Sequence, residues 1–391
     1  MSGGTVMGWG LAAPEIALAV CGMAVLLVGA IGKRESALLC TMLAMGSFLL
    51  AGALVLEVPD GLGYHGLLVG DAFSRFCMVL VLVGAALSVA LALDYDPAQG
   101  LGRPEFPVLA MFSSVGMMLM VSAASLMTLY LGLELQSLAI YVMAAFARDN
   151  VRSSEAGLKY FVLGALASGL LLYGISLVYG FTGTMSFAKL IPALDAPEGV
   201  SAGAVIGMVF IVVGLAFKVS AVPFHMWTPD VYQGAPTPVT AFMGTAPKVA
   251  AMALLVRSLV QPFGGLPWSD VLVVLSVLSM LLGALAAIAQ KNIKRLMAYS
   301  SIGHMGYALI GLAAGTPQGV RGVMVYLVTY VFMNVGTFAI VLGMRRDGRA
   351  VEGIADLAGL GKTDPVRAMW LAIFMFSMAG IPPLAGFFGK L

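Results

Sequence analysis

The stretch SAGAVIGMVFIVVGLAFKVSAVP, residues 201–223, decides the class of fold. A helix that crosses a bilayer needs about 20 mostly apolar residues, and this run is long enough. Its one charged residue, Lys218, lies deep inside the run, and Pro223 cannot donate a helical hydrogen bond to the carbonyl of Val219. The stretch therefore predicts a membrane-spanning helix that is interrupted beside an intramembrane lysine.

Eleven further apolar runs accompany this one. The twelve predicted spans are residues 11–31, 36–56, 71–93, 106–121, 124–146, 154–180, 201–222, 238–260, 269–289, 293–313, 320–343 and 366–391. The connections are mostly short, and residues 185–195 are expected to form a short interfacial helix. We therefore expect an all-α polytopic membrane protein with a single transmembrane domain over residues 1–391.

The composition supports this class and excludes others. Of the 391 residues, 60% are hydrophobic and 10% are charged, whereas soluble domains carry about 25% charged residues. A soluble enzyme, a disordered chain and a nucleic-acid binder are excluded. The three cysteines lie far apart in apolar runs, so no disulfide framework is expected. No basic residue precedes Lys33, which favours a retained first helix over a cleaved signal peptide.

Basic residues gather in one set of alternate loops. The opposite set holds only Arg75, Lys189, Arg257 and Arg321. Because cytoplasmic loops are enriched in Lys and Arg, we expect the richer set to face the cytoplasm and the N-terminus to lie on the other side. The richer set consists of Lys33, Arg34, Arg103, Arg148, Arg152, Lys291, Lys294, Arg295, Arg345, Arg346, Arg349, Lys362 and Arg367.

Four lysines and one acid remain inside apolar runs: Lys159, Lys218, Lys248, Lys390 and Glu134. A lysine at the centre of a membrane helix costs roughly 2.5–3.5 kcal/mol on the insertion scale. Such residues usually face the bundle interior, pair with one another and mark an ion path. We therefore interpret the five as candidate proton carriers.

Structural explanations compete with this interpretation at three of the positions. Lys159 lies about two turns from its helix end, so its stem could snorkel to the interface. Glu134 could be a protonated acid that bonds a neighbouring helix. Lys390 lies one residue from the end of the sequence, so its own helix does not indicate its depth.

Prolines accompany the other lysines as well. Pro247 directly precedes Lys248, and Pro383 leaves the carbonyl of Ala379 without a helical donor upstream of Lys390. Broken helices at membrane depth are tolerated where they line a cavity, although ordinary proline kinks are also common. The repeated pairing of a break with a lysine favours an ion path.

Two histidines lie near this system. His304 shares one helix face with Ser300 and Tyr307, and a neutral imidazole is suited to a proton relay, although it could instead be a packing residue. His225 follows the break at Pro223, where an anchoring role is expected.

The polar positions also indicate an internal repeat. Glu134 and His304 lie 170 residues apart, and Lys218 and Lys390 lie 172 apart. We predict two inverted five-helix repeats, residues 106–260 and an incomplete copy over residues 269–391, with the seventh and twelfth helices broken.

The sequence contains no motif that indicates a bound cofactor or metal. GLGYHG, residues 61–66, matches a dinucleotide fingerprint but lies in a loop between membrane helices instead of a βαβ unit. No His, Cys, Asp or Glu cluster has metal-ligand spacing, and no haem or flavin pattern occurs. We expect neither a bound cofactor nor a metal.

Three segments resemble a known family. They are GLAFKVSAVPFHMWTPDVYQGAPTPVTAF (214–242), SSEAGLKYFVLGALASG (153–169) and KRLMAYSSIGHMGY (294–307). They are similar to the antiporter-like membrane subunits of proton-pumping NADH:quinone oxidoreductase, respiratory complex I, and to the subunit N branch in particular. The family has about fourteen helices, whereas this sequence ends in its twelfth run, so either a C-terminal part lies outside the sequence or the protein is naturally short.

The resemblance implies roles for the intramembrane residues. Glu134 and Lys218 would form the input half of a proton channel, Lys248 the central relay with Lys159 nearby, and Lys390 the output. The position of His304 in its helix, and not the resemblance, adds it to the expected path. The resemblance also implies a bacterial inner-membrane subunit with other membrane-arm subunits and lipids as partners. NADH, FMN, iron–sulfur clusters and quinone would then belong to other subunits.

Two other classes of function stay open from the sequence. A secondary cation/proton antiporter subunit would share the helices and lysines, and only the neighbouring genes would separate it. A structural membrane scaffold would use the lysines for packing between subunits, so Lys→Met changes would alter assembly and leave pumping intact.

Overall fold

Helices form wherever the sequence supplies an apolar run, because a helix satisfies its own backbone hydrogen bonds in lipid. A computed structural model describes residues 9–32, 36–93, 102–194, 201–346 and 349–391. Each predicted span contains a helix, so the expected all-α membrane fold is confirmed. Within the described residues, nine helices are long and apolar enough to cross a membrane, and Glu105–Val121 and Pro365–Ala379 are shorter apolar helices.

Most spans are single helices, and three are broken. The single helices are α1 (Ala13–Gly32), α2 (Ala37–Leu56), α3 (Ala72–Ala90), α4 (Glu105–Val121), α5 (Leu126–Ala144), α6 (Val151–Thr182), α12 (Trp268–Ile288), α13 (Ile293–Ala313) and α14 (Pro317–Gly343). The broken spans are α8 (Ala202–Val219) with α9 (Trp227–Gly234), α10 (Thr237–Met243) with α11 (Ala246–Leu259), and α16 (Pro365–Ala379) with α17 (Ala385–Lys390). The breaks predicted in the seventh and twelfth spans are present, and the eighth span is broken as well.

Short elements connect the spans. They are β1 (Gly61–Gly63), η2 (Tyr64–Gly66), β2 (Leu68–Gly70), α7 (Phe187–Leu194), β3 (Arg345–Arg346), β4 (Arg349–Ala350), η4 (Ile354–Leu357) and α15 (Leu360–Thr363). Strands β1 and β2 pair antiparallel with Gly61 opposite Gly70, so the GLGYHG segment forms a small ribbon between α2 and α3 and not a dinucleotide-binding turn. A helix also forms in the 185–195 region, as expected.

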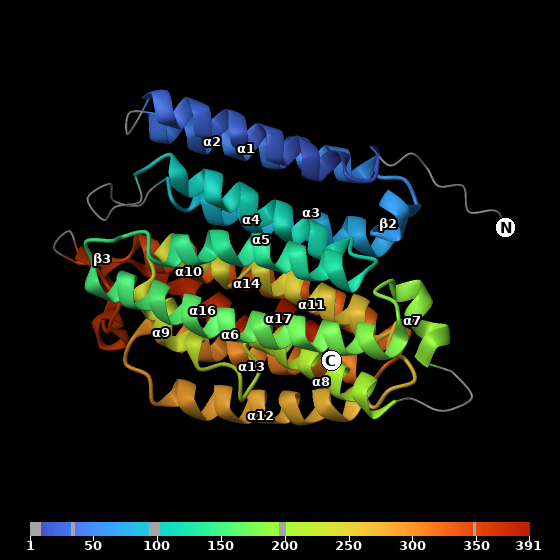
Figure 1. Ribbon diagram of the computed structural model, residues 1–391. Helices are drawn as coiled ribbons and strands as arrows, with labels where there is room; N and C mark the ends of the chain where they lie inside the picture. The colour runs from blue at the N-terminus through green and yellow to red at the C-terminus, as the bar shows by residue number, and fades with distance from the viewer. Residues whose placement is uncertain (1–8, 33–35, 94–101, 195–200, 347–348) are drawn as a thin grey trace.

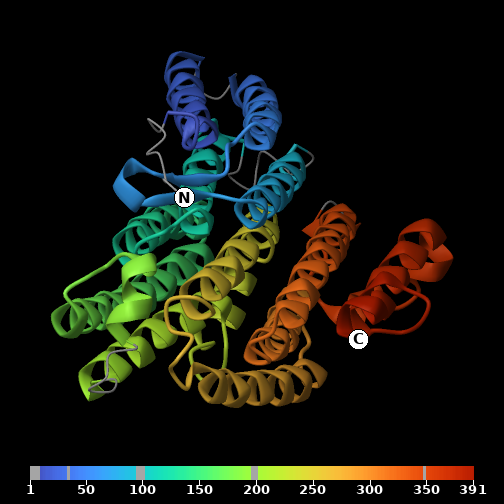
Figure 2. The same cartoon turned by 90° about the vertical axis from the view of Figure 1, so that its right-hand side faces the viewer.

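The helices run side by side, with α1 and α2 along one edge of the bundle and α12 along another (Figure 1). Viewed from one end, α14 and the α16–α17 pair occupy the flank opposite α6 and α8 (Figure 2). Isolated β-bridges join Leu68 to Ala123 and Ser125 to Ser186, so the α2–α3, α4–α5 and α6–α8 connections meet at one end of the bundle. The distribution of basic residues predicted that these three connections lie on the same side of the membrane.

We call the other end of the bundle the basic end, because Arg103, Arg148, Arg152 and Lys294 line a common pocket there. These four residues come from different connections and helix starts, as the richer set of alternate loops requires. Lys33 and Arg34 of that set lie outside the described residues.

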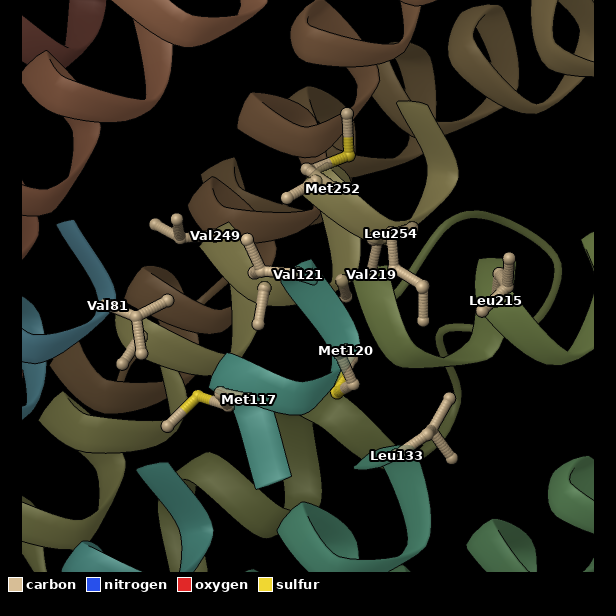
Figure 3. Close-up of a cluster of buried hydrophobic side chains, with 14 of the residues drawn as sticks. Val81, Met117, Met120, Val121, Leu133, Leu215, Val219, Val249, Met252 and Leu254 are labelled. Carbon is tan, nitrogen blue, oxygen red and sulfur yellow. The ribbon is translucent and has the colours of Figure 1, made fainter. Parts of the chain in front are cut away.

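The span formed by α10 and α11 is the centre of the bundle. All of its apolar window is buried inside the protein, whereas only 28% of the α12 window is buried. Helix α11 packs against α3, α4, α8 and α14. Figure 3 shows its side chains among methionines and aliphatic residues of α3, α4, α5 and α8. The labelled side chains are Val81, Met117, Met120, Val121, Leu133, Leu215, Val219, Val249, Met252 and Leu254. A polar group on α11 therefore faces protein and not lipid.

Glycines permit a close helix contact beside this core. A Cβ atom on Gly174 of α6 would lie 2.7 Å from the carbonyl oxygen of Gly207 on α8, and one on Gly207 would lie 2.9 Å from the carbonyl of Gly174. Small residues at such crossings let membrane helices approach closely. The contact fixes the position of α8, which carries Lys218.

Candidate functional site

Lys218 lies in the last turn of α8 and is buried, with 5% of its surface exposed. Its Nζ donates to the Ser137 hydroxyl at 2.7 Å and to the Tyr141 hydroxyl at 3.2 Å, both on α5. It also lies 5.5 Å from the centre of the Tyr141 ring. Three interactions on one side of α5 thus hold an ammonium group inside the bundle.

Glu134 lies on the same side of α5, because positions 134, 137 and 141 follow helical spacing. Its charge interacts with that of Lys218, but among the described residues the two form no ion pair. One carboxylate oxygen, Oε1, is buried and has no hydrogen-bond partner among those residues. The structure therefore holds Lys218 on neighbouring hydroxyls, with Glu134 nearby and unpaired.

Lys248 lies at the start of α11 and is 1% exposed. Its Nζ donates to the Ser220 hydroxyl and lies 3.5 Å from the carbonyl oxygen of Lys218 and 5.2 Å from the centre of the Trp227 ring. Ser220 caps the C-terminus of α8 in the left-handed region, with φ 64°. The negative end of the α8 dipole thus faces the Lys248 ammonium, which compensates part of its burial.

Lys218 and Lys248 are therefore adjacent. Both meet at the broken end of α8, Lys218 as a residue of its last turn and Lys248 as the group bonded to its cap. Thr228 on α9 also donates to the Ser220 hydroxyl, at 2.6 Å. The break predicted from Pro223 supplies the polar groups on which Lys248 rests.

His304 occupies a second polar cluster, between α13 and α14, and is 5% exposed. Its Nδ1 lies 2.5 Å from the Tyr326 hydroxyl, and its ring lies 5.4 Å from the ring of Tyr330. Tyr330 in turn shares a 2.8 Å hydrogen bond with Ser301. The face-sharing expected for Ser300 and Tyr307 is not what holds the imidazole, because its partners come from α14.

Lys390 closes this second cluster at the end of α17. Its Nζ donates to the carbonyl of Ala379 at 3.2 Å and lies 4.5 Å from the centre of the Tyr307 ring. Ala379 is the last residue of α16, and its carbonyl is the one that Pro383 was expected to leave free. Like Lys248, Lys390 rests on the C-terminal end of a broken helix.

Lys159 is placed apart from the buried lysines. It binds Glu155 at 2.7 Å and Asp230 at 2.8 Å, and its side chain is 41% exposed. Asp230 also binds Arg295 at 2.5 Å. Lys159, Glu155 and Asp230 line a pocket of about 220 Å³ at the basic end. The snorkelling considered from the sequence agrees with this exposed position.

Aromatic rings lie between this pocket at the basic end and the buried lysines. Tyr160, next to Lys159, is stacked on Trp227 at 4.3 Å and meets Tyr141 edge-on at 4.8 Å between ring centres. Tyr141 is hydrogen-bonded to Lys218, and Trp227 contacts Lys248. One layer of aromatic rings therefore separates the Lys159–Asp230 ion pair from both buried lysines. His225 lies in the α8–α9 connection, where its carbonyl accepts the amide of Thr228.

Sequence reasoning did not identify Ser137, Tyr141, Ser220, Asp230 and Tyr326 as site residues. Helical spacing from Glu134 points to Ser137 and Tyr141, and the position of Ser220 before Pro223 is also visible in the sequence. Nothing local points to Asp230 or Tyr326, whose partners lie 71 and 22 residues away. Among the described residues, no group of three or more His, Cys, Asp and Glu is arranged to hold a metal ion.

Comparison with known proteins gives consistent results. The family model described as "NADH:quinone oxidoreductase/Mrp antiporter, TM" matches residues 123–391. NADH-quinone oxidoreductase subunit N of Granulibacter bethesdensis is 64% identical over 388 residues, covering 98% of this chain and 81% of the relative. The subunit N of Rhodospirillum rubrum is 59% identical, covering 97% and 80%.

Solved structures agree with these relatives. A chain of respiratory complex I from Thermus thermophilus with bound aureothin superposes with a TM-score of 0.81 at 36% identity, covering 96% of this chain and 81% of that one. A chain of the Mrp complex from Dietzia sp. has a TM-score of 0.85 at 24% identity, covering 98% and 73%, which shows the fold alone. The chain belongs to the family of NADH-quinone oxidoreductase subunit N, within the antiporter-like membrane proteins.

Proposed function

We propose that this chain is a membrane-arm subunit that translocates protons, driven by quinone reduction elsewhere in an NADH-quinone oxidoreductase. The names of its relatives and the complex I structure support the assembly. The two buried lysines that meet at the broken end of α8 carry the proton-transfer part of the proposal. NADH, FMN, iron–sulfur clusters and quinone would be bound by other subunits.

The proposed path begins at the basic end and crosses the bundle. Lys159 and Asp230 lie in the open pocket, Glu134 and Lys218 form the input pair, Lys248 relays to His304, and Lys390 is the output. A carboxylate near an ammonium group favours its charged form, so bringing Glu134 to Lys218 favours proton capture and separating them favours release. The hydrogen bonds from Lys218 to Ser137 and Tyr141 support the existence of such a separated state.

The experiment replaces Lys218 or Lys248 by Ala in the assembled complex. Reconstituted into liposomes, each variant is expected to lose or reduce proton pumping per NADH oxidised, because the path then lacks a carrier at the α8 end. Lys362→Gln, an exposed lysine at the basic end, is the control. Assembled Lys218→Ala and Lys248→Ala complexes that pump at the wild-type ratio would contradict the proposal.

The antiporter alternative shares this fold and gains no separate support. The Dietzia Mrp chain, the solved structure that corresponds to this alternative, is 24% identical to this chain. The Granulibacter subunit N is 64% identical. The scaffold alternative predicts normal pumping in the same two alanine variants, so one experiment separates it from the main proposal.

We also propose that the basic end faces the cytoplasm of a bacterial cell and that the N-terminus lies in the periplasm. The excess of Lys and Arg in its loops supports this orientation. In a background without the three natural cysteines, an impermeant maleimide added to spheroplasts should label Asp60→Cys and not Asp149→Cys. Labelling of Asp149→Cys alone would reverse the orientation.

We propose further that residues 106–260 and 269–391 are inverted repeats. The helix breaks support this relation. Ser220 and Gly380 both have positive φ, both donate to the third and fourth residues before them, and both precede a proline by three residues. The breaks are 160 residues apart (380 − 220), not 172. Lys218 therefore precedes its break whereas Lys390 follows its own.

A further inference from the structure

The basic end holds a polar pocket that the proton path does not use. Its volume is about 410 Å³, and it lies between the start of α4, the α5–α6 connection, the α9–α10 connection and the start of α13. Four cationic side chains line it: Arg103, Arg148, Arg152 and Lys294. We propose that this pocket and the apolar groove beside it bind one anionic glycerophospholipid of the adjoining leaflet.

The cationic side chains of the pocket outnumber its acidic ones. Asp149 and Glu352 also line it, and Glu352 binds Lys294 at 3.3 Å. Within the described residues, the guanidinium groups of Arg103, Arg148 and Arg152 form no ion pair, and Arg103 Nε is buried without a hydrogen-bond partner. Since a buried unpaired donor is costly, an anionic group in the pocket would satisfy it. Three arginine forks suit a phosphodiester.

The groove supplies a place for an acyl chain. It has a volume of about 580 Å³, lies between α4, α5 and α6, and shares Arg103, Phe146 and Arg148 with the polar pocket. Val142 and Leu158 in its wall are 54% and 64% exposed. A basic pocket that opens into a lateral apolar groove matches an anionic headgroup with its chain.

The depth of the groove fits one leaflet. Its lining residues on α6 are Gly157, Leu158 and Phe161, and Phe161 lies ten residues after the first residue of that helix (161 − 151). At 1.5 Å per residue, Phe161 lies about 15 Å from the helix start, half of a hydrocarbon core about 30 Å thick. A small anion such as phosphate would use the pocket and leave the groove empty, so the joined shape favours a lipid.

The groove also reaches the proposed proton path. Tyr141 lines the groove and bonds the Lys218 ammonium at 3.2 Å. A bound acyl chain would therefore pack against the ring that holds Lys218. This consequence rests on the proposed function, whereas lipid binding itself does not.

The experiment measures binding directly in the intact complex. The whole oxidoreductase is placed in phosphatidylcholine nanodiscs containing a trace of phosphatidylglycerol with a photoreactive acyl chain, and labelled peptides are identified by mass spectrometry. We expect labelling within residues 141–161, and at least about tenfold weaker labelling in Arg103→Gln/Arg148→Gln, because each variant position loses charge-assisted hydrogen bonds. Arg148→Gln alone, at an exposed position, is the second variant if the double variant does not assemble.

The matched control removes two charges from the same end. Lys291→Gln/Lys362→Gln changes exposed lysines that do not line the pocket, and it should label like the wild type. Equal labelling of the double arginine variant, or no labelling in the wild type because another subunit covers the groove, would overturn the proposal. Competition by glycerol phosphate as strong as by phosphatidylglycerol would instead identify a free-anion site. None of these readings depends on pumping, so failure here is distinct from failure of the proposed function.

Discussion

Replacing Ser220 by Gly tests whether the broken end of α8 is a working part of the proton path. The serine hydroxyl accepts a hydrogen bond from the Lys248 ammonium group, and the serine backbone has φ 64°. Glycine removes the hydroxyl but is at ease in this left-handed conformation, which costs other residues roughly 1–2 kcal/mol. The substitution therefore separates loss of the hydrogen bond from damage to the fold.

The expected magnitude follows from the burial of Lys248, which is 1% exposed. A hydrogen bond to a charged group contributes about 1.5–3 kcal/mol, and its loss disfavours the charged form of Lys248 by about 10- to 150-fold. If Lys248 relays protons, the initial rate of proton uptake by liposomes containing Ser220→Gly complex should fall by about tenfold or more. The melting temperature of the complex in detergent should change little, because relief of about 1–2 kcal/mol of backbone strain offsets most of the lost hydrogen bond.

Thr228→Val is the control for this variant. It removes the 2.6 Å bond from Thr228 to Ser220 but leaves the serine hydroxyl available to Lys248, so pumping should stay close to wild type. Wild-type pumping by Ser220→Gly would refute the relay role of this contact. An equal loss in Thr228→Val would show that the Ser–Thr bond, and not the lysine contact, matters.

Three further predictions concern the pair on α5, the far end of the bundle and the helix crossing. Tyr141→Phe removes one of the two hydroxyl acceptors of the Lys218 ammonium. A hydrogen bond to a charged group is worth about 1.5–3 kcal/mol, so proton uptake should slow by about tenfold or more, whereas wild-type uptake would mean that Ser137 alone suffices. Burial raises the pKa of Asp71, but its hydrogen bonds and ion pair with Arg257 outweigh burial and leave this pKa below its ordinary value. The stabilisation by Asp71 is therefore present above about pH 4 and is lost as the pH falls further. The difference in melting temperature between the wild type and Asp71→Asn should shrink from pH 6 to pH 3. A difference that stays constant over this range would argue against the Asp71–Arg257 pair. Gly174→Ala places a Cβ 2.7 Å from a backbone oxygen and should lower the stability of the protein by about 1–3 kcal/mol. Gly169→Ala, on the same helix, meets open space and should be neutral or slightly stabilising. Equal melting temperatures of the two variants would contradict the tight crossing of α6 and α8.

The spans and their breaks could be predicted because each depends on local chemistry. An apolar run of about 20 residues and the missing N–H of a proline have the same consequence in any neighbourhood. The free carbonyl of Ala379 is an example, since Pro383 predicted it and Lys390 occupies it. The intramembrane cost of Lys218 and Lys248 likewise follows from residue type and depth.

The contacts of these residues could not be predicted in the same way. A membrane helix is apolar on its lipid face and on its protein face, so periodicity in the sequence says little about which side turns inwards. Lys159 illustrates this, because its partner Asp230 is 71 residues away on the second half of a broken helix. Its separation from Lys218 by a layer of aromatic rings is visible only in the packed bundle.

The sequence by itself determined that this is an all-α membrane protein, that its seventh and twelfth spans break, and that Lys218 and Lys248 are buried. It did so because the bilayer sets the length of each span and penalises each charge independently of the rest of the chain. Only the tertiary structure decided that Lys248 rests on the end of α8, that Lys218 bonds hydroxyls of α5 while Glu134 stays unpaired, and that three arginines share one pocket. These arrangements depend on how helices far apart in the sequence rotate and cross, which is fixed by close packing between small residues and by polar contacts.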